Sequence, residues 1–515
     1  MMDAGIGSWL TKRAGLSGDR VALVFRGRRL TYSELDARTS QLARALKDDL
    51  GIRRGDRVGM LLLNSPEFIE TMFAAAKLGA IAVPINFRLA APEVSYVLSD
   101  ASADVLVAHE QLGELARAAI PGTRVRHLVV VDGAPGTGEI AYEELLGSGE
   151  PLTLDMQVTP DDVHALMYTS GPTGRPKGAM LTHANTMANA RNALLVGRGL
   201  RETDVTVTVA PMFHIGGLGV HSLPFIYIGA TNVVLASFDP AATLATMAAE
   251  RATVQFLVPA MWGALMQVPD FDSYDLSALE LAVSGGAPCP LTIIEFFQGK
   301  GVPFQEGFGM TETAPIVSVL DAAHVKEKAG SIGRPLMHVE ARIVDDFDRD
   351  MPPDTVGELV LRGENIFAGY WMLPEATAEA FRNGWFHTGD LGRVDDEGFV
   401  TLVDRKKDMV ITGGENVYPI EVEQVLFRHP AVREASVFGV PNAKWGEEVV
   451  AAVAFKPDAA VPPSELIAYC RERLAHFKCP SRVEVVGELP RNATGKVLKT
   501  RLREMYGGSS SAVSR

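Results

Sequence analysis

Short apolar runs of strand length alternate with helical patterns along the first half of the chain. Continuous apolar runs of this kind are typical of parallel strands that helices cover on both faces. The alternation therefore predicts an α/β fold with mostly parallel, buried strands. The expected strands are residues 58–63, 105–107, 128–131 and 205–209, and the expected helices include residues 32–50 and 66–78.

The chain of 515 residues is long enough for at least two domains, since single hydrophobic cores stop growing near ~250–300 residues. Strand-like segments at residues 340–344, 357–362 and 398–403 predict a smaller β-rich subdomain. The charged run DRKKDM at residues 404–409 is the strongest boundary candidate. We expect an N-terminal domain at residues 1–403, a hinge at 404–408, a mobile α+β domain at 409–506 and a disordered tail at 507–515.

The small C-terminal domain has a pattern of its own. It predicts helices at residues 419–427 and 463–475 and strands at 435–440 and 449–455. From Met409 onward the chain carries 14 Lys and Arg against 12 Asp and Glu, whereas the whole chain has a net charge of −14. A slightly basic small domain beside an acidic body suits a polyanionic co-substrate, although a solvated helical face is the commoner explanation.

Composition excludes several classes of protein. A net charge of −14 argues against a general nucleic-acid binder. Three scattered cysteines, Cys289, Cys470 and Cys479, form neither a disulfide framework nor a zinc site. With no signal-peptide pattern at the N-terminus, we expect a cytoplasmic protein.

One stretch, residues 205–238, contains no charged residue and is long enough to span a bilayer. Pro211, Pro224 and several glycines interrupt it, which favours buried strands and turns over a continuous helix. No basic amphipathic helix demands membrane contact, so we expect at most a peripheral one.

Residues 168–178, YTSGPTGRPKG, combine glycines, hydroxyls and a lysine. Glycines let a backbone approach an anion closely, and hydroxyls with an ammonium group supply donors and positive charge. The spacing is not that of the Walker loop, and an ordinary glycine-rich turn is the alternative. The segment predicts a site for a nucleotide triphosphate, with Gly178 at its end and with Thr169, Ser170, Gly171, Thr173, Gly174 and Lys177 as candidate ligands.

With this segment and the charged hinge, the chain resembles the adenylate-forming superfamily of acyl-CoA synthetases, adenylation domains and luciferases. The resemblance covers nearly the whole chain and lies closest to the fatty-acyl-CoA ligases of the FadD type. Besides YTSGPTGRPKG, it depends on PMFH at 211–214, GGA at 285–287, GFGMTE at 307–312, TGD at 388–390, DRKKD at 404–408, GGEN at 413–416 and PRNATGK at 490–496.

The resemblance implies a two-step reaction on one active site. A carboxylate attacks the α-phosphate of ATP, pyrophosphate leaves, and a thiol then captures the acyl-adenylate. It implies that Lys496 bridges the carboxylate and the α-phosphate, that Thr311 binds the same phosphate, and that Glu312 holds Mg²⁺. Lys496 as a solvated lysine in a turn is the structural alternative.

The resemblance also implies a nucleoside site. Phe308 would stack on adenine, with Gly285, Gly286 and Ala287 flat against the base. Asp390 would accept hydrogen bonds from both ribose hydroxyls, and Arg405 would reach the ribose or phosphate. Phe308 as a core residue and Asp390 as a plain turn residue are the alternatives. The remaining candidates of the GFGMTE segment are Gly307, Gly309 and Met310.

Domain rotation is the third implication. The hinge would fall at Lys407, and rotation would exchange Lys496 for Gly413, Gly414 and Glu415 beside a narrow channel for the pantetheine of coenzyme A.

The acyl group is expected beside His214, for which a gate or pocket wall is favoured over a catalytic acid or base. The expected lining offers no cationic partner for a second carboxylate, so an apolar acid of medium or long chain, or a cyclic or aryl acid, fits best. The lining residues are Phe213, Ile215, Gly216, Gly217, Ala314 and Pro315.

Pro172 stands where the superfamily usually has Thr or Ser. Proline lacks both the hydroxyl and the backbone N–H, so the loop offers up to two fewer donors, each worth about 1.5–3 kcal/mol to a charged group. We expect Pro172→Thr to raise the rate of pyrophosphate release. An unchanged or lower rate would refute the donor deficit.

Three functions remain open. The leading one is an acid:CoA ligase that uses ATP and Mg²⁺, as a monomer or homodimer. The second delivers the adenylate to an amine or a carrier-protein thiol. The third is a non-catalytic ligand-binding relative, which the retained Lys496, Thr311, Glu312, Asp390 and Arg405 disfavour.

Overall fold

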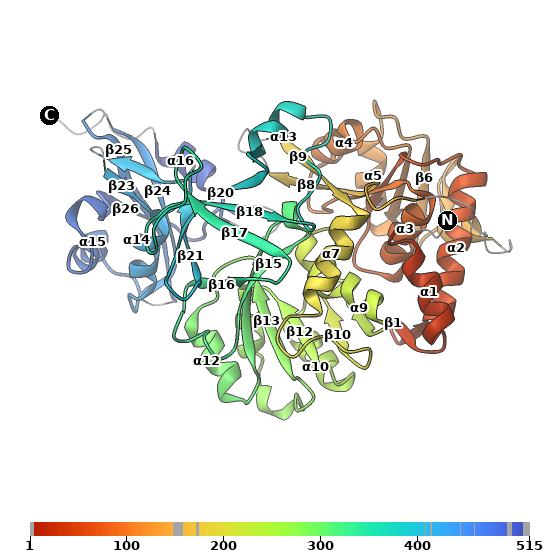
Figure 1. Cartoon of the computed structure of the whole chain (residues 1–515), viewed down its shortest axis with the longest axis horizontal. Coiled ribbons are helices and arrows are strands. Elements are labelled where there is room, and N and C mark those ends of the chain that lie inside the picture. The colour runs from red at the N-terminus through yellow and green to blue at the C-terminus, as the bar shows by residue number, and fades with distance from the viewer. Residues whose placement is uncertain are drawn as a thin grey trace. The chain divides into compact units, whose positions relative to one another are not determined.

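The computed structural model describes residues 5–147, 158–170, 175–406, 408–412, 415–442, 444–457, 459–491 and 497–507. The chain divides into two compact units (Figure 1). Unit 1 comprises Met1–Ala341 and Leu361–Phe386, and unit 2 comprises Arg342–Val360 and His387–Arg515. The expected hinge run lies within unit 2, and its role as a hinge stays a prediction. Of the expected tail, only Gly507 is among the described residues.

A seven-stranded sheet in unit 1 confirms the expected parallel arrangement. Its order is β7-β6-β5-β3-β4-β8-β9, and every neighbouring pair is parallel except β8 and β9. The central strands are buried along their whole length, as their continuous apolar sequences require. The strands are β3 (Arg57–Leu61), β4 (Ile81–Pro84), β5 (Val105–His109), β6 (His127–Val131), β7 (Ile140–Ala141), β8 (Val163–Ser170) and β9 (Pro176–Thr182).

The helices of this region begin at residues with clear capping roles. Thr31 and Glu34 form a capping box at the start of α2 (Tyr32–Asp48). Ser65 caps α3 (Pro66–Leu78), which ends at Gly79 with φ 65° and is buried throughout. The other helices are α1 (Ser8–Ser17), α4 (Ala91–Asp100), α5 (Gly113–Ala119), α6 (Tyr142–Leu146) and α7 (His183–Ala193).

The uncharged stretch at residues 205–238 begins and ends with strand, but its centre is helical, so the expectation of strands and turns is partly wrong. Strands β10 (Val205–Thr208) and β11 (Thr231–Val234) join β1 (Val21–Phe25) and β2 (Arg28–Thr31) in a four-stranded sheet. Between them lie α8 (Ile215–Gly217), a π-helical turn (Leu218–Ser222) and α9 (Leu223–Ile228). Pro224 is tolerated because it lies in the first turn of α9, and Gly229 ends that helix with φ 86°. No helix in the described ranges is long and apolar enough to cross a membrane.

The rest of unit 1 carries the segments with the sequence motifs. Strands β12 (Val254–Leu257), β13 (Leu281–Gly285) and β14 (Phe304–Gly309) are parallel, and β15 (Ile316–Leu320) and β16 (Ser331–Pro335) continue the sheet antiparallel. Trp262, Phe297 and Phe304 pack ring against ring in the core beneath them. The helices are α10 (Pro240–Ala249), α11 (Pro259–Met266), α12 (Leu291–Gly299) and α13 (Pro374–Ala380), which precedes the short strand β19 (Phe381–Arg382).

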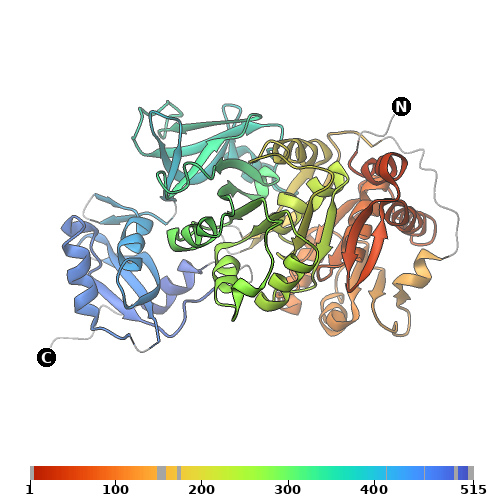
Figure 2. The ribbon, with the colours of Figure 1, turned by 90° about the horizontal axis from the view of Figure 1, so that it is seen from below.

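Strand-rich segments around residues 340–405 match the expected β-rich subdomain: β17 (Val339–Val344), β18 (Gly357–Gly363), β20 (Trp385–Val394) and β21 (Val400–Arg405). The C-terminal part of unit 2 forms a sheet of β22 (Val410–Thr412), β23 (Glu415–Val417), β24 (Val432–Asn442), β25 (Gly446–Phe455) and β26 (Arg482–Val485). The sheet and its helices are coloured blue in Figure 2. The helices are α14 (Pro419–Phe427), α15 (Pro463–Arg471) and α16 (Lys499–Tyr506). Helix α15 ends four residues before the expected end at 475, because a turn and the 3₁₀ segment His476–Lys478 follow it.

Three buried histidines predict that unit 1 loses stability in mild acid. Burial lowers the pKa of His109 and His183 to about 4 and that of His221 to about 3. The unfolded chain binds protons at these groups below about pH 6.5 while the folded chain stays neutral, so stability is lost from pH 6.5 down to about pH 4. Each histidine contributes at most roughly 1 kcal/mol per pH unit in that window. Thermal unfolding at pH 7, 6 and 5 should show a falling Tm.

The matched variant is His183→Asn, because asparagine can still accept the hydrogen bond that Ile6 N donates to His183 Nδ1 at 3.1 Å. Its Tm should fall less between pH 7 and pH 5 than that of the wild type. An equal fall in both proteins would show that His183 does not carry the effect.

Candidate active site

The predicted phosphate segment is a β-hairpin. Strands β8 and β9 are antiparallel, with Thr169 opposite Lys177 and Tyr168 opposite Gly178. Lys177 therefore lies in a strand and not in the loop, so its position is fixed by backbone pairing. The turn itself, with Gly171, Pro172, Thr173 and Gly174, and the side chain of Ser170 lie outside the described residues.

The two glycine-rich segments of the expected nucleoside site lie side by side. Gly285 on β13 pairs with Gly307 on β14, and a Cβ on Gly285 would lie 2.9 Å from the Gly307 carbonyl oxygen. Gly286 has φ 86°, a conformation that favours glycine, and Ala287 after it is exposed. Phe308 is half-buried, so it is not a residue of the hydrophobic core.

A buried carboxyl lies directly before Gly307. Glu306 accepts a hydrogen bond at Oε1 from Cys289 N at 3.0 Å, and burial raises the pKa of Glu306 to about 7. Burial also raises the pKa of the Cys289 thiol to about 12, which leaves it unreactive.

The turn that carries Thr311 and Glu312 is held by hydrogen bonds to backbone atoms. Met310 N donates to Thr313 Oγ1 at 2.9 Å, and Thr311–Thr313 form a 3₁₀ turn. Asn365 Nδ2 donates to the carbonyl oxygens of Thr313 and Ile316, at 2.9 and 3.2 Å. Thr311 is half-buried, and only 8% of Glu312 is exposed.

Two glycines of this segment provide a matched test of packing. A Cβ on Gly309 would lie 2.0 Å from the Pro315 carbonyl oxygen, whereas the nearest atom to a Cβ on Gly307 is 3.7 Å away. Gly309→Ala should lower the free energy of unfolding by about 1–3 kcal/mol, the usual cost of overpacking. Gly307→Ala should leave Tm close to wild type, because its Cβ has room within the protein. It should weaken ATP binding, because Gly307 is a candidate residue of the nucleoside site.

Differential scanning calorimetry and ATP titration separate the two effects. Equal Tm values for both variants would contradict the predicted clash at Gly309.

The two segments expected to line the acyl site, one around His214 and one at Ala314 and Pro315, contact each other. A Cβ on Gly219 would lie 2.5 Å from Pro315 Cδ, and one on Gly217 would lie 2.3 Å from the Pro211 carbonyl oxygen. Gly219 therefore lies against Ala314 and Pro315, while Gly217 packs against the backbone of Pro211 in its own segment. Phe213 and Ile215 are buried, and the Phe213 ring meets Phe87 edge-on at 5.1 Å. Gly216 is half-buried.

His214 lies at the start of α8 with its side chain partly in solvent. Its Nδ1 accepts a hydrogen bond from Gly216 N at 3.1 Å, and desolvation by the surrounding protein lowers its pKa. A neutral imidazole in this position is consistent with a pocket wall or gate.

Buried asparagines were missed by the sequence analysis. Asn64 Nδ2 donates to Ala210 O at 3.0 Å, and Met212 N donates to Asn64 Oδ1 at 2.8 Å. Asn189 Nδ2 donates to Gly219 O at 2.7 Å, and its Oδ1 accepts from Ile316 N at 3.0 Å. Asn64 and Asn189 therefore fix the backbone of both segments by hydrogen bonds. The available signal was the spacing of Asn185, Asn189 and Asn192 on a helix, since intervals of four and three residues put them on one buried face.

In unit 2, the TGD segment lies in strand β20. Thr388 Oγ1 donates to Leu359 O at 2.7 Å and accepts from Asp390 N at 3.0 Å. Asp390 is 5% exposed and lies in the strand, so it is not a plain turn residue. Its Cα partner on β21 is Arg405, whose side chain lies outside the described residues.

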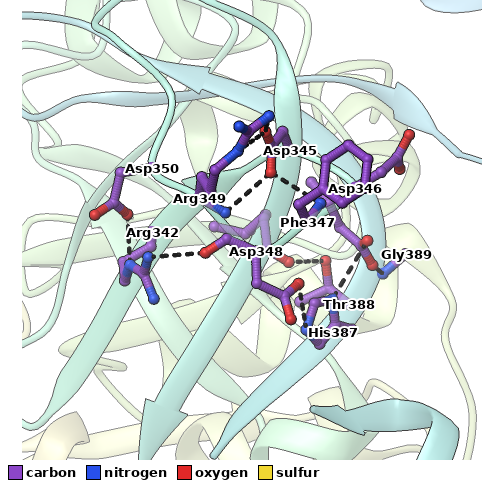
Figure 3. Close-up of polar contacts among 12 residues, drawn as sticks. Arg342, Asp345, Asp346, Phe347, Asp348, Arg349, Asp350, His387, Thr388 and Gly389 are labelled. Atoms are coloured by element: carbon purple, nitrogen blue, oxygen red, sulfur yellow. Dashed lines mark hydrogen bonds and ion pairs between the residues drawn. The ribbon is translucent and has the colours of Figure 1, made fainter. Parts of the chain in front are cut away.

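Charged groups surround this segment (Figure 3). His387 lies between two carboxylates, with Nε2 3.5 Å from Asp348 Oδ1 and Nδ1 3.3 Å from Glu358 Oε2. Glu358 Oε1 also accepts from Gly389 N at 3.2 Å. A hydrogen bond to Asp346 raises the pKa of Lys406, whose backbone N donates to Gly389 O. The strand segment before Asp390 is therefore held by His387 and Glu358, which no motif identified, and by the backbone of Lys406 in the DRKKD run.

The remaining candidates fall largely outside the described residues. These are Lys407, Gly413, Gly414 and Lys496. Glu415 is described, and lies exposed at the start of β23.

Comparison with known families identifies the class of protein. A family model described as AMP-binding enzyme matches residues 10–371, and one described as AMP-binding enzyme C-terminal domain matches residues 421–496. The chain belongs to the AMP-binding enzyme family, and the resemblance to the adenylate-forming superfamily is confirmed.

Individual relatives are similar over nearly the whole chain. Feruloyl-CoA synthase of Amycolatopsis sp is 42% identical over 507 residues, which cover 98% of this chain and 100% of that protein. Long-chain-fatty-acid–CoA ligase FadD13 of Mycobacterium tuberculosis is 37% identical over 483 residues, 93% of each chain. The crystal structure of the anthranilate CoA ligase AuaEII in complex with anthranoyl-AMP has a TM-score of 0.89 and 32% identity, covering 98% of this chain and 99% of that one. The chain is thus an enzyme of the acyl-CoA synthetase branch.

Proposed function

We propose that the chain is an ATP-dependent carboxylic acid:CoA ligase that forms an acyl-adenylate and releases AMP and pyrophosphate. The observation that carries the proposal is in unit 1, where Lys177 and Glu312 both contact Tyr370. A cation on the phosphate hairpin and a buried carboxylate at one place are what a Mg²⁺-bound triphosphate requires.

The residues of the candidate site are compatible with a Mg²⁺ ion that binds together with the nucleotide. Among the described residues, no group of three or more His, Cys, Asp or Glu side chains could hold a metal alone. Mg²⁺ typically uses one or two carboxylates together with substrate phosphates, so Glu312 with the triphosphate suffices. When bound, the ion neutralises charge on the phosphates.

In the proposed first step, the protein orients the two reactants and stabilises charge. Lys177 and the hydroxyls of the hairpin bind the leaving phosphates, and Thr311 and Lys496 bind the α-phosphate that the carboxylate oxygen attacks. Phe308 with Gly285 and Gly286 would hold the adenine, and Asp390 with Arg405 the ribose.

In the second step, the thiolate of coenzyme A attacks the acyl carbon and AMP leaves. We propose that rotation at Lys407 removes Lys496 and brings Gly413, Gly414 and Glu415 to the site between the half-reactions. A cytoplasmic location and a monomer or homodimer stay predictions.

An apolar or aryl carboxylic acid is the proposed substrate class. The lining contributed by Phe213, Ile215 and Pro315 is apolar, and the neutral His214 offers no charge to a second carboxylate. The names of the relatives, which include feruloyl, long-chain fatty and anthranilate ligases, support this range.

The test is AMP release from ATP with a panel of ferulate, indoleacetate, anthranilate and long-chain fatty acids, each with and without CoA. We expect a thioester and AMP in equal amounts, dependent on CoA, with at least one of these acids. Release of AMP with amines or a carrier protein and not with CoA would favour the second function. Absence of ATP–pyrophosphate exchange with every acid would favour a non-catalytic relative.

A further inference from the structure

Tyr370 lies in a segment that is paired directly with the phosphate hairpin. Met180 N donates to Gly369 O at 2.9 Å, and Trp371 N donates to Gly178 O at 2.8 Å. Tyr370 itself forms a bridge with Ala179 on β9. The backbone of Tyr370 is therefore fixed relative to Lys177, two residues before Ala179 on the same strand.

The Tyr370 side chain meets two oppositely charged groups. Its hydroxyl donates to Glu312 Oε1 at 3.1 Å, and Lys177 Nζ lies 5.0 Å from the centre of its ring. The latter is within the range of a cation–π interaction.

Its surroundings restrict the ring. Phe367 packs edge-on against it at 4.9 Å, and the Tyr370 backbone N donates to Thr377 Oγ1 at 2.9 Å. Phe367 N in turn donates to the Glu312 carbonyl oxygen at 2.9 Å. The segment therefore joins the hairpin to the Glu312 turn through backbone and side chain.

We infer that Tyr370 is a positioning residue that orients Glu312 for the divalent cation and Lys177 for the phosphates of ATP. The ring carries no net charge, so it holds both groups while leaving the ammonium able to meet phosphate and the carboxylate able to meet a cation. A direct ion pair between Lys177 and Glu312 would instead compete with the ligand for both charges. The inference rests on the proposed function, since it assigns how this site receives Mg²⁺ and ATP.

The first test is Tyr370→Phe, which removes the hydroxyl and keeps the ring. Isothermal titration of ATP at graded Mg²⁺ should show about 10-fold weaker binding at limiting Mg²⁺, the usual size of a loss beside a metal ligand. Raising Mg²⁺ should restore most of the affinity. The rate of adenylate formation should shift to higher Mg²⁺ in the same way.

The matched control is Tyr142→Phe. Tyr142 is a buried tyrosine whose hydroxyl donates to Glu70 Oε2 at 2.8 Å, between α6 and α3. Its loss removes the same kind of hydrogen bond and should lower Tm without changing the Mg²⁺ dependence of ATP binding.

The second test concerns the ring. Tyr370→Leu should weaken ATP binding further than Tyr370→Phe, because the lysine contact is also lost. In a Lys177→Ala background this additional loss should disappear, since the ring then has no ammonium to hold.

Equal Mg²⁺ dependence in Tyr370→Phe and wild type would overturn the inference, as would an equal shift in Tyr142→Phe. Titration of ATP needs no turnover, so this outcome is distinct from failure of the proposed function, which would appear as a wild-type protein that activates no acid.

Discussion

Replacing Lys496 with alanine is expected to slow acyl-adenylate formation by about 100- to 1,000-fold, the cost of deleting one transition-state donor. The capture of a preformed acyl-adenylate by CoA should stay close to the wild-type rate, because the proposed rotation removes Lys496 before that step. Stopped-flow or quench measurements of each half-reaction separate the two effects.

Lys456→Ala is the control, because Lys456 is an exposed lysine of the same unit outside every motif. It should leave both half-reactions unchanged. A Lys496→Ala enzyme that loses both half-reactions equally would contradict domain alternation, and one that keeps adenylation would remove Lys496 from the mechanism.

The second large effect is expected for Glu312→Gln. The amide keeps the shape of the side chain and can still accept from Tyr370, but it loses the charge that would hold Mg²⁺. Charge stabilisation by a metal is worth several kcal/mol, so adenylation should fall by about 100-fold or more. Pyrophosphate release measured against Mg²⁺ concentration is the readout.

Glu250→Gln provides the comparison, since Glu250 forms a surface ion pair with Arg29 at 2.6 Å and lies in no motif. It should match the wild type. A Glu312→Gln enzyme with wild-type Mg²⁺ dependence would show that the ion is bound elsewhere.

Local patterns were sufficient for most elements of the fold. Helix α3 has the predicted bounds because Ser65 caps its start and Gly79 can adopt the left-handed conformation at its end. Strands β3, β5 and β6 followed from continuous apolar runs. The centre of residues 205–238 was misjudged, because Pro224 was taken as an interruption although proline is acceptable in the first turn of a helix.

Candidate residues within contiguous motifs could be named from the sequence, whereas contacts between distant segments could not. The glycines of GGA and GFGMTE were assigned to the nucleoside site by resemblance, and the pairing of Gly285 on β13 with Gly307 on β14 came only from the structure. In contrast, Tyr370 reaches Glu312 from 58 residues away, and Asn365 holds the same turn from 52. His387 and Glu358 likewise depend on strands that pair only in the folded chain. Such contacts leave no periodic signal in one sequence.

Oxygen-isotope transfer tests the central claim, formation of an acyl-adenylate, most directly. The enzyme would be incubated with ATP, CoA and a free carboxylic acid that it accepts as substrate, with ¹⁸O in the carboxylate. The AMP and pyrophosphate would then be analysed by mass spectrometry. Attack of the carboxylate on the α-phosphate predicts one ¹⁸O atom in AMP and none in pyrophosphate. Unlabelled AMP, or ADP and phosphate as products, would contradict it.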